Sequence, residues 1–515
     1  CTDSGREGEY IYRLVAQMAG VKDKQQKRVW IDSQTEEEIL RGIHEAKDES
    51  EYDNLSASAY LRAKEDYLMG INFSRVLTLR YGPSMSQYLG TKFTVLSVGR
   101  VMTCVLGMVV RREREIRNFV KTPFYRVLGS FQAIAKDGTP VLLDAEWKAV
   151  EGSKYFKTPY LYKENGFKER EKAEELIAYL KAELPLEVQV LSKEKKKETK
   201  NPPLLYNLAE LQNDCSKMFK ISPDETLKVV QELYEKKLVT YPRTDARVLS
   251  TAVAKEIYKN ISGLMHYEPM AGFAKEAIDL GSFKVIGKTR YVNDKQITDH
   301  YAIIPTGQGM SALSGLSWTS RAVYDVIVRR FLSIFYPAAV YQKVAITTKV
   351  KEESFFASFK VLAEPGYLKV VGVPGEKKGE SGSAAGAEDR NVSGSVTSAE
   401  TGDGSGDNNS GDNGDGNEDM ASSQAFFEKI QSLKKGMTLP IQGMEIKEGK
   451  TSPPKRYNSG SLILAMENAG QLIEDEELRA QIKGSGIGTS ATRGEILKKL
   501  FNNKYLALNK KTQIV

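Results

Sequence analysis

A tyrosine, an arginine and an aspartate alternate along the segment Tyr241-Pro-Arg-Thr-Asp245. Pro242 biases Tyr241 toward an extended backbone, and every second side chain of an extended segment points to one face. A guanidinium can bind a phosphodiester through two hydrogen bonds and neutralise charge on phosphorus. A phenol with a pKa of about 10 needs such help to act as a nucleophile. The pattern therefore suits phosphoryl transfer, and a buried tyrosine beside a surface arginine is the alternative.

An acidic segment, Asp3-Ser-Gly-Arg-Glu7-Gly-Glu9, lies where a strand is expected to end and a helix to begin. Gly5 and Gly8 permit a tight turn there. Mg²⁺ is a hard cation that takes few carboxylates and keeps several waters. Asp3 and Glu7 are therefore candidate magnesium ligands, and a helix with an acidic first turn is the alternative.

The segment Asp299-His300-Tyr-Ala-Ile-Ile-Pro-Thr306 places one of only three histidines before a short apolar strand. A histidine can donate to a phosphate oxygen or orient an acid near neutral pH. His300 is therefore a candidate for the same chemistry, although a lone histidine is more often structural.

Two glycine-containing turns lead into helices. In Ser97-Val-Gly-Arg100-Val-Met-Thr103 the hydroxyls and the guanidinium are potential phosphate contacts, with a plain turn as the alternative. The segment Gly484-Ser-Gly-Ile-Gly-Thr-Ser-Ala-Thr-Arg493 lacks the Gly-Lys-Ser/Thr of a nucleotide P-loop. A backbone or DNA-phosphate contact is therefore favoured there over ATP binding.

The elements that position these motifs can be placed coarsely. We expect a helix over Arg13–Met18, a short strand at Trp30 and Ile31, and a long helix over Leu55–Leu79. Ser222-Pro-Asp-Glu225 predicts a helix start, because it combines an N-cap serine, a proline at the first helical position and a capping-box glutamate.

Strand-like alternation is expected between about Phe124 and Val190, over Val344–Val350 and over Ser358–Leu362. Residues 375–423 are rich in Gly, Ser, Asp and Asn and almost lack large apolar side chains. Such a composition predicts a disordered insert.

The chain of 515 residues exceeds what one core supports, so we expect three or more domains. We expect neither a membrane span nor a signal peptide. Cys1, Cys104 and Cys215 show no C-x-x-C spacing, which disfavours a zinc site or a disulfide framework and fits a reducing cytoplasm.

The net charge of +7 conceals a local charge of −9 between residues 379 and 420, which leaves +16 for the rest. A body this basic suggests a polyanionic partner, most simply nucleic acid. Ordinary solvated lysines and arginines are an equal alternative.

In their order along the chain, these segments resemble the type IA DNA topoisomerases of the bacterial topoisomerase III kind. The resemblance covers essentially the whole chain outside the insert. The matching segments are Thr2-Asp-Ser-Gly-Arg-Glu-Gly-Glu9, Arg62-Ala63 through Asp66 to Gly70-Ile-Asn72, Ser97-Val-Gly-Arg-Val101, Pro202-Pro-Leu-Leu-Tyr-Asn-Leu208, Leu233-Tyr-Glu-Lys-Lys-Leu-Val-Thr-Tyr-Pro-Arg-Thr-Asp245, Asp299-His-Tyr-Ala-Ile-Ile-Pro-Thr306 and Gly486-Ile-Gly-Thr-Ser-Ala-Thr-Arg493.

The resemblance implies a multidomain fold of α/β, α and β parts that closes into a toroidal clamp. The implied parts are a partial Toprim domain (1–47), a DNA-binding helical domain (48–120 and 450–515), a β-rich arch or hinge (121–200 and 340–449, with the insert) and a winged-helix-like domain that carries the tyrosine (201–339).

The resemblance also implies roles for single residues. Tyr241 would attack the phosphodiester and hold the 5′ phosphate, while Arg243 would stabilise the scissile phosphate and His300 would assist. Asp3 and Glu7 would bind Mg²⁺. The implied DNA contacts are Ser97, Arg100, Thr103, Arg62, Asn72, Asp245, Thr489, Thr492 and Arg493.

The implied function is ATP-independent cleavage, strand passage and religation of DNA, which relaxes negative supercoils or decatenates DNA. The DNA would be single-stranded at the cleavage site. We expect a cytoplasmic monomer that does not bind a membrane.

Some positions depart from the family pattern. Gly5 stands where the family has the second aspartate of D-x-D, and Met102 and Cys104 replace a glutamine and a proline. The family's first Toprim strand, with a glutamate and a lysine that serve the chemistry, would precede Cys1, and we expect a fragment that also lacks the C-terminal end. The alternative function is therefore a DNA-binding clamp that is catalytically incomplete.

Overall fold

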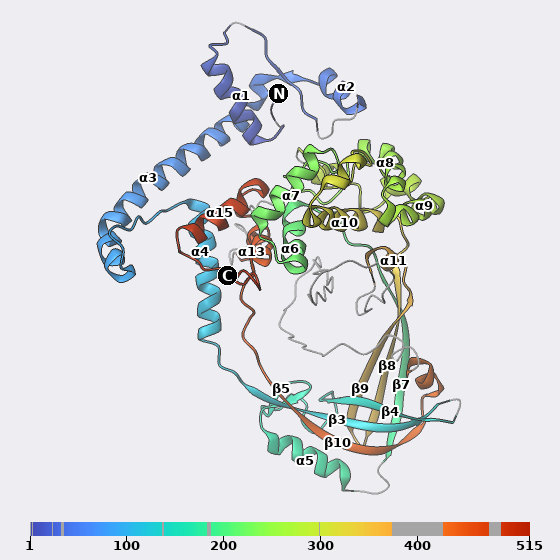
Figure 1. Ribbon diagram of the computed structural model, residues 1–515. Helices are drawn as coiled ribbons and strands as arrows, with labels where there is room; N and C mark the ends of the chain where they lie inside the picture. Colours follow the sequence, from blue (N-terminus) through green and yellow to red (C-terminus); the bar gives the residue numbers. More distant parts are fainter. Residues whose placement is uncertain are drawn as a thin grey trace.

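The helices and strands of the chain form four groups, of which three surround an opening as a ring, and the N-terminal group lies beside that ring (Figure 1). The computed structural model describes residues 2, 4–22, 24–31, 36–135, 138–182, 187–297, 299–372, 426–472 and 486–515. Asp3, Cys1 and the expected insert at 375–423 lie outside these residues. No helix within the described ranges is long and apolar enough to cross a membrane.

The N-terminal group contains two short helices and a pair of two-residue strands. Its elements are α1 (Arg6–Met18), β1 (Lys27–Arg28), α2 (Glu36–His44) and β2 (Lys47–Asp48). The strand expected at Trp30 and Ile31 is wrong, because the paired residues are Lys27 and Arg28. The ring of Trp30 instead stacks on that of Tyr52 at 5.9 Å.

A long helix, α3 (Asp53–Leu89), leads away from this group (Figure 1). The expected helix over 55–79 is therefore correct but too short, since α3 continues past Pro83 to Gly90, whose φ is 64°. The residues after it fold back on the helix, and Ser86 Oγ donates to Thr94 Oγ1 at 3.1 Å.

The second group is built from segments that are far apart in the sequence. Its helices are α4 (Arg100–Arg117), α13 (Ser459–Glu467) and α15 (Ser490–Asn502). They share a hydrophobic core that contains Val105, Leu462 and Leu500. The chain therefore returns after the arch to complete a unit that α4 begins.

The third group carries Tyr241 and has the largest hydrophobic core. Its helices are α6 (Leu208–Phe219), α7 (Pro223–Glu235), α8 (Thr251–Gly263), α9 (Ala271–Leu280), α10 (Trp318–Ser333) and α11 (Leu368–Val371). The capping box expected at Ser222 and Glu225 is confirmed, with Ser222 N donating to Glu225 Oε2 at 2.8 Å and Glu225 N donating to Ser222 Oγ at 3.2 Å. We call this group the tyrosine lobe.

The fourth group is an arch of antiparallel strands with one helix, on the side of the ring opposite α1 and α2 (Figure 1). Its elements are β3 (Pro123–Ile134), β4 (Pro140–Lys148), β5 (Leu161–Lys163), β6 (Gly166–Phe167), α5 (Arg170–Lys181), β7 (Glu187–Lys200), β8 (Ala339–Val350), β9 (Glu353–Glu364) and β10 (Thr438–Lys450). The order is β10-β7-β8-β9-β4-β3-β6-β5, and the additional pairing of β10 with β3 closes the sheet like a barrel. The strands expected over 344–350 and 358–362 are confirmed within β8 and β9.

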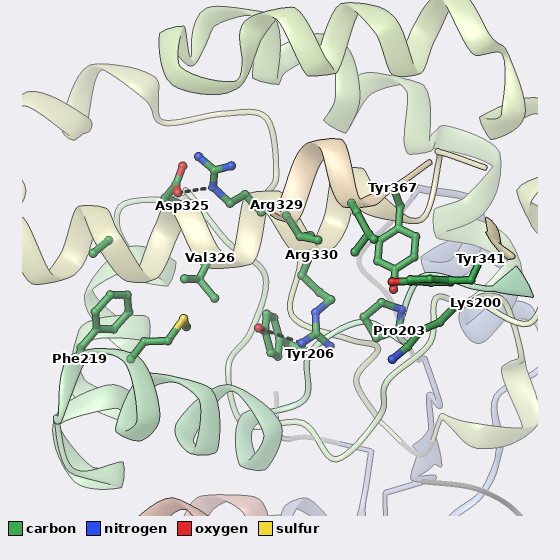
Figure 2. Close-up of a pocket in the computed structure, with 15 residues that line it drawn as sticks. Lys200, Pro203, Tyr206, Phe219, Asp325, Val326, Arg329, Arg330, Tyr341 and Tyr367 are labelled. Carbon is green, nitrogen blue, oxygen red and sulfur yellow. Dashed lines mark hydrogen bonds and ion pairs between the residues drawn. The ribbon is translucent and has the colours of Figure 1, made fainter. Parts of the chain in front are cut away.

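The long strands β7 and β8 join the arch to the tyrosine lobe at Lys200 and Ala339. A cavity of about 380 Å³ lies at this junction and is lined by Lys200 and Tyr341 of the arch and by Phe219, Val326 and Leu368 of the lobe. Figure 2 shows these side chains around α10 and the ends of the strands. The cavity lies where the arch meets the tyrosine lobe and does not include Tyr241.

A buried guanidinium supports the floor of this cavity (Figure 2). Arg330 is 4% exposed and donates to Tyr206 Oη at 3.0 Å, to Asp214 Oδ2 at 3.1 Å and to Leu204 O at 3.0 Å. Tyr206 Oη also donates to Asp214 Oδ2 at 2.7 Å. The buried positive charge of Arg330 is thus paired with the buried negative charge of Asp214.

Replacement of this guanidinium should destabilise the tyrosine lobe strongly. Arg330→Ala leaves Asp214 buried without its counter-charge, and removing one partner of a buried pair costs about 3–5 kcal/mol. Urea unfolding followed by tyrosine fluorescence measures the loss. Lys275→Ala, at an exposed position of α9, is the control, and equal stability of the two variants would contradict the expectation.

Candidate active site

Two chain segments lie antiparallel and place the tyrosine beside the histidine. Thr240 N donates to Ile304 O at 2.9 Å, and Ile304 N donates to Thr240 Oγ1 at 3.0 Å. Thr244 Oγ1 donates to the backbone oxygen of His300 at 2.9 Å. As a result the ring centroids of Tyr241 and His300 lie 4.3 Å apart.

The accessibility of this segment alternates as expected for an extended backbone. Arg243 and Asp245 are exposed and Tyr241 is half-buried, whereas Pro242 and Thr244 between them are buried. The ring of Tyr234, in the last turn of α7, meets that of Tyr241 edge-on with centroids 5.5 Å apart. The phenol therefore lies in an aromatic seat beside an accessible guanidinium.

An ion pair ties this segment to the group formed by α4, α13 and α15. Arg493 is 2% exposed, and its Nη1 donates to Asp245 Oδ1 at 2.9 Å. The guanidinium also donates to the backbone oxygens of Ile487 and Gly488, so the turn before α15 wraps around it. Asp245 and Arg493, two of the expected DNA contacts, thus bind each other.

A buried carboxyl group completes this junction. Asn207 Nδ2 donates to Glu467 Oε1 at 2.5 Å and to the backbone oxygen of Asp245 at 3.1 Å. Burial raises the pKa of Glu467, and the nearby carboxylate of Asp245 adds to this effect while Arg493 opposes it. Gly486 has a φ of 61°, and a Cβ there would lie 2.6 Å from Glu467 O, so the turn requires glycine.

The acidic segment before and at the start of α1, which we call the acidic turn, faces the tyrosine lobe. Gly5 is the N-cap of α1, and an ideal Cβ on it would lie 3.2 Å from Asp299 Oδ2. Asp299 directly precedes His300, so the acidic turn and the tyrosine seat approach each other here. Glu7, a candidate magnesium ligand, is mostly exposed and pairs with Arg62 at 3.0 Å. The other candidate, Asp3, lies outside the described residues.

Three guanidinium groups from different helices gather beside this turn. Arg62 pairs with Glu7, and Arg100 at the start of α4 donates to both carboxylate oxygens of Asp66 at 2.9 and 3.2 Å. Partial desolvation lowers the pKa of Arg6, and the positive charges of Arg62 and Arg100 lower it further. Like charges this close form a site that an anion would stabilise.

The remaining expected DNA contacts are Ser97, Thr103, Asn72, Thr489 and Thr492. Ser97 N donates to Tyr505 Oη at 2.7 Å, and Thr103 is exposed in the first turns of α4. Asn72 Nδ2 caps the backbone oxygen of Leu68 at 2.9 Å. Thr489 and Thr492 form the capping box of α15, with their hydroxyl oxygens 3.0 Å apart.

The structure gives a physical reason for one departure in α4. Met102 is 8% exposed and belongs to the core shared with α13 and α15, so its side chain faces helices. Cys104 is exposed. The residue at position 102 therefore contributes to the core. The side chains of Arg100 and Thr103, in the first turn of α4, lie on its accessible side.

No group of three or more His, Cys, Asp or Glu side chains that could hold a metal occurs among the described residues. Mg²⁺ needs only one or two protein carboxylates, and Glu7 and Asp299 both lie at the acidic turn. These two residues fit a site of that kind.

Four residues of the site were not among the sequence candidates: Arg6, Asn207, Asp299 and Glu467. Arg6, Asn207 and Asp299 lie within the segments that resemble the family, so their place in those segments could have identified them as site residues. Glu467 carries no local signal, because its partners are 260 positions away at Asn207 and 26 positions away at Arg493.

Comparisons with known proteins agree on one group. Residues 50–403 and 414–515 match the sequence model of a family described as DNA topoisomerase. DNA topoisomerase 3 of Bacillus subtilis is 32% identical over 507 residues, which are 98% of this chain and 58% of that protein. DNA topoisomerase 3 of Bacillus licheniformis is 32% identical over 97% of this chain and 58% of its own length. The chain thus spans somewhat more than half the length of these relatives.

A solved structure shows the same fold. Full-length topoisomerase I from Thermotoga maritima superposes with a TM-score of 0.59 at 20% sequence identity, over 98% of this chain and 66% of that chain.

The buried carboxyl group predicts a pH dependence of stability. Because the folded pKa of Glu467 is raised, its contribution is fully present below the ordinary glutamate value of about 4.3 and is lost as pH rises through the folded value. Glu467→Gln keeps the acceptor for Asn207 and removes the titration. The stability of the variant should fall less with rising pH, by at most about 1.4 kcal/mol per pH unit.

Thermal unfolding of the parent chain and the variant, at pH values from 4 to 8, measures this difference. Glu428→Gln, at an exposed position, serves as the control. Parallel curves for the parent and Glu467→Gln would show that Glu467 does not titrate differently in the folded chain.

Proposed function

The chain belongs to the type IA DNA topoisomerases, to their topoisomerase III-like members, and we propose that it cleaves, passes and reseals single DNA strands. The observation that carries the proposal is the placement of Tyr241 beside His300, facing the acidic turn and its guanidinium groups. A nucleophile, an anion site and candidate cation ligands meet there. Relaxation of negative supercoils and decatenation are both outcomes of this reaction.

The proposed reaction begins with attack of Tyr241 Oη on phosphorus. Tyr241 Oη gives up its proton as the Oη–P bond forms, the bond from phosphorus to the 3′ oxygen breaks, and that oxygen takes up a proton and leaves as a hydroxyl. The 5′ phosphate stays on Tyr241 as a phosphodiester. One ester replaces another, so the reverse attack by the 3′ hydroxyl reseals the strand without ATP.

Neighbouring side chains would assist at defined points. Arg243 is exposed on the face that Tyr241 shares and would bind the non-bridging oxygens of the scissile phosphate. His300 would donate a hydrogen bond to the same phosphate or orient the phenol. The Asp245–Arg493 pair would act as a positioning contact that fixes the backbone after the tyrosine.

DNA binding would use the cations around the acidic turn. Arg6, Arg62 and Arg100 would contact backbone phosphates, and the hydroxyls of Ser97, Thr103, Thr489 and Thr492 and the amide of Asn72 would add contacts along the strand. Such contacts hold the backbone without reading sequence.

Mg²⁺ would be held at the acidic turn by Asp3 and Glu7. When bound there, the cation would offset negative charge on the DNA phosphates. The ion pair with Arg62 holds the Glu7 carboxylate in position against α3.

The ring would serve as the gate for strand passage. In this proposal the N-terminal group is part of a Toprim domain, the tyrosine lobe is winged-helix-like, and the arch with its hinge at Lys200 and Ala339 allows the lobe to move. A monomer would suffice, because one chain contains both sides of the gate.

Tyr241→Phe should abolish the covalent protein–DNA adduct, because it removes the attacking oxygen and keeps the ring. The adduct would be trapped with denaturant on a labelled single-stranded oligonucleotide in the presence of Mg²⁺. Tyr234→Phe is the matched control, since that phenol lies beside the first. Adduct from Tyr241→Phe would refute the role of Tyr241, and a parent chain that binds DNA without forming adduct would favour the non-catalytic clamp.

Arg100→Gln should weaken single-strand binding and its dependence on salt. Loss of one phosphate contact reduces the slope of log K against log salt by about 0.7 for single strands. Fluorescence anisotropy of a labelled oligonucleotide at several salt concentrations measures both quantities. Lys275→Gln, on the exposed side of α9, should leave the slope unchanged, and an unchanged slope for Arg100→Gln would remove Arg100 from the binding surface.

A further inference from the structure

Tyr241 lies on a short segment that is anchored on both sides. On one side, the backbone N–H of Thr240 donates to Ile304 O at 2.9 Å, and Ile304 N donates to Thr240 Oγ1 at 3.0 Å. On the other side, Leu208 N at the start of α6 donates to Thr244 O at 3.1 Å. The position of the phenol therefore depends on two anchors, and the second of them belongs to α6.

Asn207 completes the second anchor with a buried side chain that uses its whole amide group. It is the N-cap of α6, and its Oδ1 accepts from Glu210 N at 2.9 Å. Its Nδ2 donates to two oxygens, the backbone oxygen of Asp245 at 3.1 Å and Glu467 Oε1 at 2.5 Å. Serine and aspartate cap a helix about as well as asparagine, so the cap alone does not call for an amide. The two donated hydrogen bonds are what the amide adds.

The partner of this amide lies at the end of a helix that also holds the glycine-rich turn. Glu467 is the last residue of α13. The backbone oxygen of the residue before it, Met466, accepts from Ile487 N at 2.7 Å, and Ile487 belongs to the turn that leads into α15. One helix end thus contacts both the amide that anchors the tyrosine segment and the turn that carries proposed DNA contacts. The distance between those contacts and Tyr241 is therefore fixed at the end of α13.

We propose that Asn207 and Glu467 are positioning residues, which hold the segment of Tyr241 at a fixed distance from the DNA strand bound by the group of α4, α13 and α15. They act on the phenol through the backbone of Asp245. This inference rests on the proposed function, because it assigns what places the nucleophile of that reaction. A displacement of about 1 Å caused by a change far from the chemistry can lower a rate about 100-fold. The role is therefore visible in the rate of cleavage and not in the affinity for DNA.

Asn207→Asp tests this role, because it keeps the capping oxygen and removes both donated hydrogen bonds. The rate constant for covalent adduct formation is measured in a single turnover, with Mg²⁺ and a saturating labelled single-stranded oligonucleotide. It should fall at least about tenfold, the loss expected for a hydrogen bond to a charged group. Fluorescence anisotropy of the same oligonucleotide should give the dissociation constant of the parent chain, since the proposed DNA contacts are unchanged.

Glu467→Gln provides the rescue. In the double variant Asn207→Asp with Glu467→Gln, the new amide at position 467 can donate to the new carboxylate at position 207. The link between α6 and α13 is then restored with its direction reversed, so the double variant should regain part of the lost rate. Glu467→Gln alone keeps an oxygen that accepts from Asn207 and should lose less than Asn207→Asp. The two single variants and the double variant form a cycle that isolates this contact.

Asn458→Asp is the matched control. Asn458 is likewise the N-cap of a helix, α13, and its Oδ1 accepts from Ser461 N at 2.7 Å. No residue in the described part of the chain accepts a hydrogen bond from its amide group. The change should therefore leave the rate constant of the parent chain unaltered.

Thermal unfolding checks that each variant is folded. Asn207→Ser, which also keeps a capping oxygen and adds no charge, replaces Asn207→Asp if the latter does not fold. An unchanged rate in the folded variant of Asn207 would overturn the inference, as would an equal loss in Asn458→Asp or a loss that Glu467→Gln does not reduce. A parent chain without adduct would refute the proposed cleavage and this inference together, whereas adduct at equal rates in every variant would overturn the positioning role alone.

Discussion

The pairing between the segment of Tyr241 and the segment of His300 is the interaction on which the site depends. Pro242 has no backbone N–H and cannot take part in a regular ladder. The threonines on either side provide the hydrogen bonds instead, with Thr240 Oγ1 joined to Ala302 O and Ile304 N, and Thr244 Oγ1 to His300 O. Side-chain hydroxyls thus preserve the register that a proline would otherwise interrupt.

The two sides of the tyrosine lobe are held with different firmness. Toward α13 and α15 the contact is buried and charged, since Arg493 pairs with Asp245 while Asn207 bridges to Glu467. Toward the N-terminal group the lobe is joined by the exposed ion pair of Lys255 with Glu37 of α2 and by the close approach of Asp299 to Gly5, the N-cap of α1. This difference suits the proposed reaction, in which Tyr241 would keep its place while the lobe separates from the N-terminal group.

Local features were predictable because their causes are local. The helix start at Ser222 and the alternation from Tyr241 to Asp245 follow from neighbouring residues and are seen in the structure. The strand expected at Trp30 and Ile31 was wrong: Lys27 and Arg28 form the strand pairing, and the Trp30 ring stacks on Tyr52. Closure of the sheet by β10 and β3, and the junction of Asn207 with Glu467, join residues that are hundreds of positions apart. Neither the hydrophobic periodicity nor the spacing of motifs along the sequence predicts such contacts.

Position 5 shows how a distant contact changes the meaning of a local departure. Read along the chain, a glycine in place of an aspartate removes a metal ligand. In three dimensions the space beside Gly5 contains the carboxylate of Asp299 from the tyrosine lobe. The departure at position 5 therefore coincides with a contact between the N-terminal group and the tyrosine lobe, which joins residues almost 300 positions apart in the sequence.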